Sequence, residues 1–116
     1  MQKLSLDALA RELLTRATGD RSSGAGGGSR AAQTVVGGHE KTLRQTVIAL
    51  AKDSALAEHT SPGEATLYVL RGRVTLTAGA ESWDAREGDL LILPDAPHSL
   101  TARTDSAVLL TVAKHP

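Results

Sequence analysis

The spacing of apolar residues changes near residue 33, and this change most constrains what the chain can fold into. From there to the end, short runs rich in Val, Ile, Leu and Thr are separated by turn signals such as 61–63 and 71–72. The runs recur mostly at intervals of about 8–12 residues, which is typical of an all-β sandwich or barrel. Because no helical pattern separates them, parallel βαβ units are not expected.

The predicted strands differ in how many of their faces are apolar. We expect strands at 33–36, 42–51, 55–60, 65–71, 73–78, 81–84, 90–94, 98–103 and 106–113. The runs 67–70 and 90–93 are apolar on both faces. Such strands belong in the middle of a two-sheet structure or at a subunit interface.

The first segment, 1–19, predicts an amphipathic helix. Ser5 is a candidate N-cap and Gly19 a candidate end. One face carries the apolar stripe Leu6, Leu9, Ala10, Leu13, Leu14 and Ala17. The stripe has two possible partners, the surface of the same domain or a second copy of the chain.

Residues 20–32 predict a linker between the helix and a β domain over 33–116. Gly and Ser dominate 22–29. A segment of this composition buries too little apolar surface to offset its ordering entropy, so we expect it to be flexible.

Composition excludes several function classes. The length of 116 residues indicates one domain. The chain has no cysteine, which excludes disulfides, zinc fingers and thiol nucleophiles. Its formal charge is zero and only 2% of its residues are aromatic, which argues against nucleic acid as a partner. No apolar run approaches the roughly 18 residues of a membrane span, and no signal peptide is recognisable. We therefore expect a cytoplasmic protein without membrane contact.

Two segments carry a family resemblance. In "EHTSPGEATLYVLRG", His59 and Gly72 occupy the first metal-histidine and the closing glycine positions of the first cupin motif. Ser61 stands at the second histidine position, and Ala65 at the glutamate position. In "EGDLLILPDAPHSL", His98 stands one residue early for the histidine of the second motif. The stretch from about residue 42 to 114 thus resembles a small single-domain cupin.

The resemblance implies a double-stranded β-helix, the jelly-roll barrel, preceded here by the helix. It also implies that Ala65, Leu67 and Val69 face the barrel interior, lining a pocket with Ser61, while Tyr68 faces outward. Arg44 and Arg73 are interpreted as solvated charges on the sheets. Because the family includes dioxygenases, isomerases, metal-free binding domains and storage proteins, the fold alone does not select an activity.

A metal site is the sharpest functional possibility that the resemblance raises. Typical cupin sites use three imidazoles and one carboxylate to hold Fe, Mn, Ni, Zn or Cu. Here the matching ligands reduce to His59 and His98, with Glu64 and His39 as further candidates. In a regular strand, however, Glu64 points away from the face of Ala65.

Two hypotheses for the function follow. The first is a cupin that binds a small molecule at a degenerate metal site. The second is a divalent-metal enzyme, a dioxygenase or isomerase, that uses His59 and His98. A homodimer is expected in either case, from Tyr68, Leu70 and the helix stripe.

Overall fold

The computed structural model describes residues 1–19, 29–60 and 63–114. Most of the predicted linker, together with Ser61 and His115, lies outside these residues. The described residues form one helix and nine strands. These are α1 (Leu6–Gly19), β1 (Arg30–Val36), β2 (Leu43–Leu50), β3 (Ala55–His59), β4 (Gly63–Arg71), β5 (Arg73–Ala78), β6 (Glu81–Arg86), β7 (Leu90–Ile92), β8 (His98–Ala102) and β9 (Ser106–Lys114). Among the described helices, none is long and apolar enough to span a membrane.

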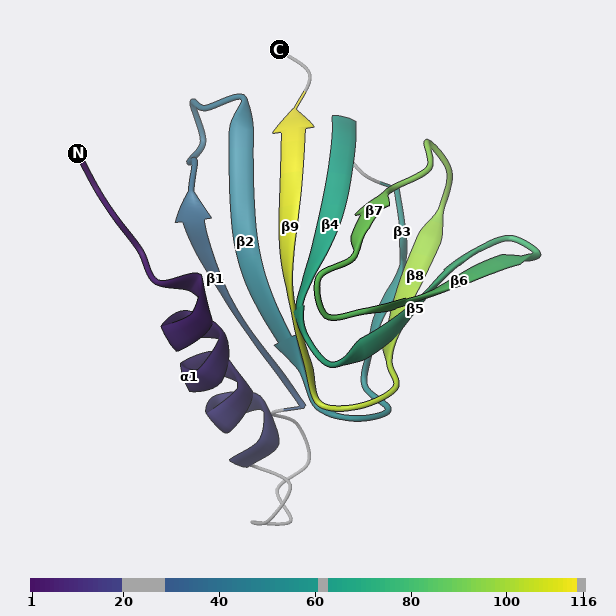
Figure 1. Ribbon diagram of the computed structural model, residues 1–116. Coiled ribbons are helices and arrows are strands. Elements are labelled where there is room, and N and C mark those ends of the chain that lie inside the picture. The colour runs from purple at the N-terminus through teal and green to yellow at the C-terminus, as the bar shows by residue number, and fades with distance from the viewer. Residues whose placement is uncertain (20–28, 61–62, 115–116) are drawn as a thin grey trace.

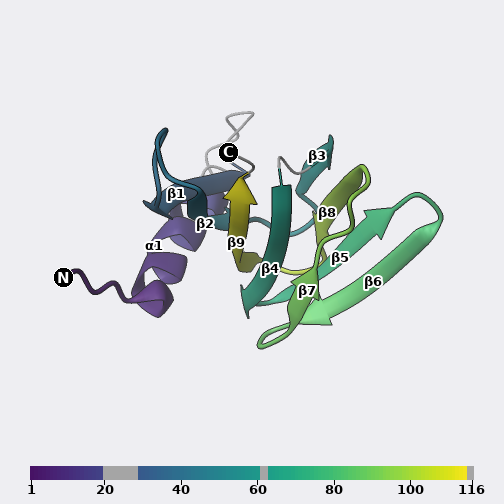
Figure 2. The ribbon, with the colours of Figure 1, turned by 90° about the horizontal axis from the view of Figure 1, so that it is seen from above.

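The strands form two antiparallel sheets, as the all-β prediction requires. One has the order β1-β2-β9-β4-β7 and the other β3-β8-β5-β6. Viewed from above, the sheets curve around a shared interior (Figure 2). The start of β2, the start of β4, the end of β9 and the end of β3 all lie at the same end of the barrel (Figure 1). We call this end the mouth.

Alternation along the strands fills most of the interior with aliphatic side chains. In β4, Ala65, Leu67 and Val69 are buried, whereas Tyr68 between them is 39% exposed, as the resemblance implied. The main core cluster contains Ile48, Leu50, Leu67, Val69, Val74, Leu76, Ala85, Leu91, Leu100, Ala102 and Val108. These side chains pack against one another in a single core cluster that draws on both sheets.

Helix α1 packs on the outer face of the five-stranded sheet. Its first turn is capped by Ser5, whose Oγ accepts a hydrogen bond from the backbone N–H of Ala8 at 3.1 Å. Leu13 and Ala17 are fully buried and cluster with Val47 and Ala49 of β2. The stripe therefore covers its own domain (Figure 1), the first of the two partners considered for it.

Two segments differ from the sequence-based expectation. Residues 30–32, predicted as linker, belong to β1 and pair with 48–50 of β2. The strand predicted at 33–36 therefore begins three residues earlier, and its start is missed because its burial pattern, mostly exposed, does not follow a regular alternation. Strand β7, predicted to be covered on both faces, is the edge of its sheet, and its Leu90 and Ile92 are 59% and 72% exposed.

Candidate functional site

Two histidines meet at the barrel mouth. His59 ends β3, His98 begins β8, and the two residues pair directly across these strands. Their ring centroids are 4.7 Å apart, with the ring planes inclined by 61°. His98 lies on the same face of β8 as Leu100 and Ala102, which belong to the interior core. The pair is therefore built into the inner wall of the barrel.

A β-bulge aligns this pair. Leu56 pairs with Leu100, and the next pair is His59 with His98, so β3 advances three residues where β8 advances two. Without this extra residue, regular pairing would place Glu58 opposite His98. The bulge thus brings an imidazole, instead of a carboxylate, to the position opposite His98.

Hydrogen bonds fix the tautomer of both rings. Nδ1 of His98 lies 2.9 Å from the carbonyl oxygen of Ala96, and Nδ1 of His59 lies 3.0 Å from that of Ala57. A carbonyl only accepts, so each Nδ1 carries the proton and donates it. In the neutral rings, each Nε2 is therefore left as a hydrogen-bond acceptor.

The two Nε2 atoms differ in their surroundings. His98 is only 2% exposed, and its Nε2 is buried without a hydrogen-bond partner. His59 is exposed. The site thus presents one unsatisfied acceptor within the wall and a second imidazole at its rim.

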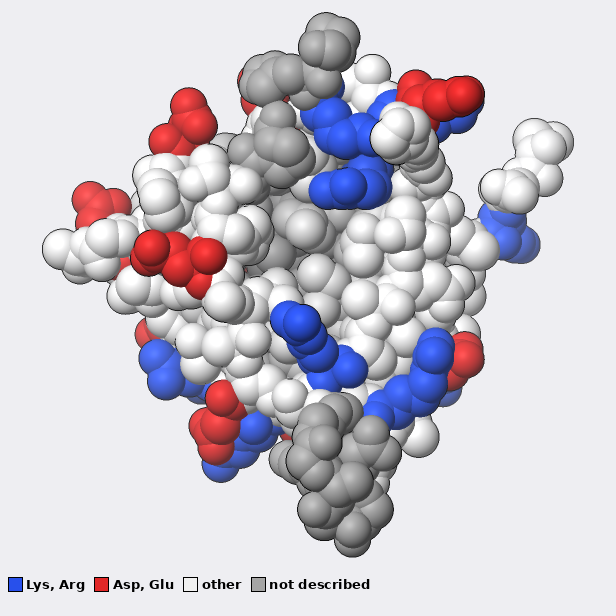
Figure 3. All heavy atoms as spheres, turned by 180° about the vertical axis from the view of Figure 1, so that it is seen from behind, with Lys and Arg blue, Asp and Glu red and all other residues white. Residues whose placement is uncertain are grey.

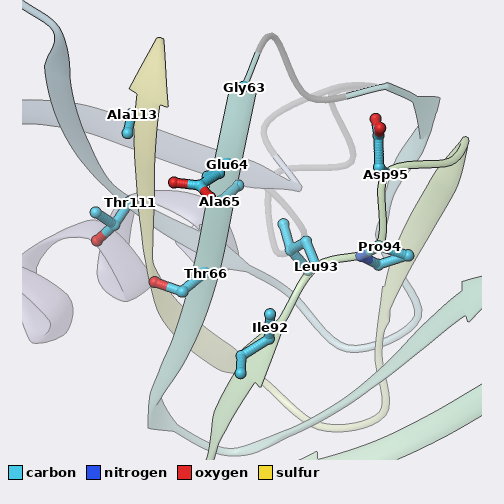
Figure 4. A pocket seen from close by; sticks show the side chains of 10 residues that line it. All are labelled: Gly63, Glu64, Ala65, Thr66, Ile92, Leu93, Pro94, Asp95, Thr111 and Ala113. Carbon is cyan, nitrogen blue, oxygen red and sulfur yellow. The ribbon is translucent and has the colours of Figure 1, made fainter. Parts of the chain in front are cut away.

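The other candidate metal ligands do not join this pair. Glu64 pairs with Ala113 on the outer face of the sheet, as alternation predicted. There it borders a groove of about 870 Å³ with Thr66, Thr111 and the 92–95 segment (Figure 4). His39 is exposed in the turn between β1 and β2. Within the described residues, no three His, Asp or Glu side chains group as a metal site.

Arg44 reaches the interior face, although we expected it to be a solvated charge. It pairs with Val112 of β9, which in turn pairs with Ala65, and both are buried inside the barrel. Arg44 itself is half-buried. A signal for this placement was present, because Arg44, Thr46, Ile48 and Leu50 occupy alternate positions on one strand face. Arg73, by contrast, is exposed as predicted.

The donor set fits only part of the metal site that the resemblance implied. His59 and His98 supply two imidazoles, each oriented by a carbonyl in the manner usual for metal-binding histidines. Ala65 offers no donor atom at the carboxylate position. The described residues therefore fit a two-nitrogen site and not the four-ligand site.

The sequence matches a known family over more than half of its length. The model of the cupin domain matches residues 46–113, from within β2 to within β9. The chain belongs to the cupin family. This confirms both the resemblance and the jelly-roll fold predicted from it. A comparison with curated proteins finds no match.

Solved structures of other cupins and related proteins agree with this fold. A conserved protein of unknown function from Streptococcus pyogenes is 31% identical, with 75% of each chain covered and a TM-score of 0.68. A cupin superfamily protein from Desulfitobacterium hafniense is 14% identical, covers 98% of this chain and 92% of its own, and has a TM-score of 0.74.

A much longer enzyme shares the same architecture. Salicylate dioxygenase from Pseudoaminobacter salicylatoxidans is 19% identical, with a TM-score of 0.77. The match covers 95% of this chain but only 34% of the dioxygenase. At this identity, the likeness supports the cupin fold alone.

Proposed function

We propose that this cupin binds a small molecule at the barrel mouth through the histidine pair. The observation that carries the proposal is the buried Nε2 of His98, which has no hydrogen-bond partner. A ligand with a hydroxyl or N–H group would satisfy that acceptor. His59, 4.7 Å away between ring centroids, would contact the same ligand from the rim.

Energetics favour a binding role for His98 over a purely structural one. A buried polar atom without a partner costs about 1–3 kcal/mol. The hydrogen bond from Nδ1 to Ala96 returns about 1 kcal/mol. An aliphatic side chain on this wall, like that of the neighbouring Leu100, would avoid the cost of the bare nitrogen.

A divalent-metal enzyme is the second candidate. The observation that favours it is that both Nδ1 atoms are held by carbonyl groups, which leaves two Nε2 lone pairs on neighbouring strands. A bound Fe, Mn, Ni, Zn or Cu ion would supply Lewis-acid chemistry at this position. We place this candidate second because the described residues provide only two such donors.

Metal analysis of untagged protein separates the two candidates. The variants are His59→Ala and His98→Ala, with His39→Ala as the matched control because His39 lies in an exposed turn. Binding without metal predicts no stoichiometric ion after reconstitution with Fe, Mn, Ni, Cu or Zn. Near-stoichiometric metal that is lost in the first two variants and kept in the control would favour the enzyme instead.

We also propose that the protein forms a homodimer. The helix stripe no longer supports this, because it packs within the domain. The support comes from Tyr68, Leu90 and Ile92, which are 39%, 59% and 72% exposed. They lie together on the outer face where β4 pairs with the edge strand β7. A second copy seated there would cover the face of β7 that the sequence pattern marks as apolar.

A further inference from the structure

Arg44 is a cation on the inner face of the barrel mouth without a counter-ion. It is the second residue of β2, on the face shared with Val112 and Ala65. Among the described residues, no carboxylate lies within 4.0 Å of it and no side-chain hydrogen bond satisfies it. Viewed from behind, the surface is hollowed near its centre, and Lys and Arg side chains border the hollow (Figure 3).

Arg44 is the cation at the mouth whose side chain has no hydrogen-bond partner among the described residues. The ammonium group of Lys114 donates to the carbonyl oxygen of Gly38 at 3.0 Å. Glu64, the acidic residue nearest to Ala65 in sequence, is on the opposite face of β4. The inner neighbours Ala65 and Val112 are apolar and buried. In such surroundings, a half-buried guanidinium attracts an anion more strongly than it would in water.

We propose that the ligand of this cupin is a small organic carboxylate, with its carboxylate on Arg44 and a hydrogen-bond donor on Nε2 of His98. This inference rests on the proposed binding function and adds the chemical class of the ligand. The two anchors belong to different sheets, Arg44 to the five-stranded sheet and His98 to the four-stranded one. A ligand that reaches both would therefore bridge the barrel.

A carboxylate fits better than a phosphate. The guanidinium group binds a carboxylate through two parallel hydrogen bonds, so one arginine satisfies one negative charge. A phosphate monoester carries a second negative charge near neutral pH and would need a further cation.

Titration with matched probes tests this inference. The probes are straight-chain hydroxycarboxylates from glycolate upward, each paired with its own primary amide, which keeps the hydroxyl and removes the charge. Binding is followed by calorimetry and by chemical-shift changes at His98. The variants are Arg44→Met, Arg44→Lys and the outward control Arg73→Met. The dispersion of the backbone amide resonances in their NMR spectra verifies that each variant is folded.

The expected result is that at least one carboxylate binds roughly tenfold or more tightly than its amide, as a charge-assisted hydrogen bond predicts. Arg44→Met removes this preference, Arg44→Lys keeps part of it, and Arg73→Met leaves it unchanged. If amides bind as tightly as carboxylates, or if Arg44→Met keeps the preference, the carboxylate inference is wrong while the binding function stands. If no probe of either kind perturbs His98, both proposals are overturned.

Discussion

His59 and His98 face each other across β3 and β8, with their ring centroids 4.7 Å apart and both Nδ1 atoms held by backbone carbonyls. Two strands of one sheet thus bring two imidazole rings together at the mouth end of the barrel. The Nε2 atom of His98 is buried without a partner. A purely structural role for His98 leaves this nitrogen without a purpose.

The first prediction separates binding from stability at His98. His98→Leu removes the unsatisfied Nε2 and keeps an apolar volume, so the free energy of unfolding should stay the same or rise by up to about 2 kcal/mol. Ligand binding should be lost. Leu100→Ala is the control on the same face of β8, and it should cost about 2–5 kcal/mol because it opens a cavity in the core. Urea denaturation measures the free energy of unfolding of both variants. If His98→Leu lowers this free energy as much as Leu100→Ala does, the imidazole is needed to stabilise the core.

The packing of the helix gives a second prediction. Leu13 is fully buried between α1 and the outer face of the sheet. Leu13→Ala should therefore lower the free energy of unfolding by about 2–5 kcal/mol. Leu14→Ala, at a half-buried neighbour, should cost less. Equal and small losses in the two variants would show that the helix does not dock on the sheet in solution.

A third prediction concerns the β4–β5 turn. Gly72 has a φ of +81°, and a Cβ there would clash with the carbonyl oxygen of Asp105 and the hydroxyl of Ser106. Gly79 also has a positive φ, +61°, but has no atom within 4 Å of its Cβ position. Gly79→Ala should cost about 1–2 kcal/mol from backbone strain alone. Gly72→Ala should cost at least about 1 kcal/mol more because the adjoining chain must shift. Thermal unfolding of the two variants checks this order, and the reverse order would contradict it.

The fourth prediction concerns the homodimer. Light scattering at tens of micromolar should give the mass of two chains. Ile92→Lys should yield monomers, because it places a charge in the exposed apolar set on β4 and β7. Leu43→Lys is the matched control, since Leu43 is also exposed, at 44%, but lies at the start of β2. A monodisperse wild-type monomer would contradict the dimer proposal.

Much of the fold follows from local patterns in the sequence. The helix, its Ser5 cap and the alternation in β4 are set by residues close together in the chain, so periodicity and turn chemistry predict them. The start of β1 is different. Arg30–Ala32 are small or polar and mostly exposed, and they form a strand because β2 offers pairing partners. The periodicity of residues within one segment does not reveal pairing with another strand.

The candidate site was predictable in its residues but not in its geometry. Comparison of the sequence with the cupin motifs identified His59 and His98 as candidate site residues. Their alignment depends on the bulge in β3. Regular pairing of β3 with β8 beyond Leu56 would leave His59 one residue away from the position opposite His98.

Arg44 was misassigned for another reason. A charged residue is usually solvated, and this expectation outweighed the alternation of Arg44 with Ile48 and Leu50. The pairing of β2 with β9 shows that Arg44 faces inward.

The most direct test of the account is side-chain nitrogen NMR of His98 during titration with the hydroxycarboxylate probes. Nδ1 of His98 should keep its hydrogen bond to the carbonyl of Ala96 throughout the titration. The Nε2 resonance should shift in a saturable way as a ligand donor reaches it, and the resonances of His39 should not move. A His98 Nε2 resonance that stays unchanged with every probe would contradict the claim that this buried nitrogen is the ligand-binding atom.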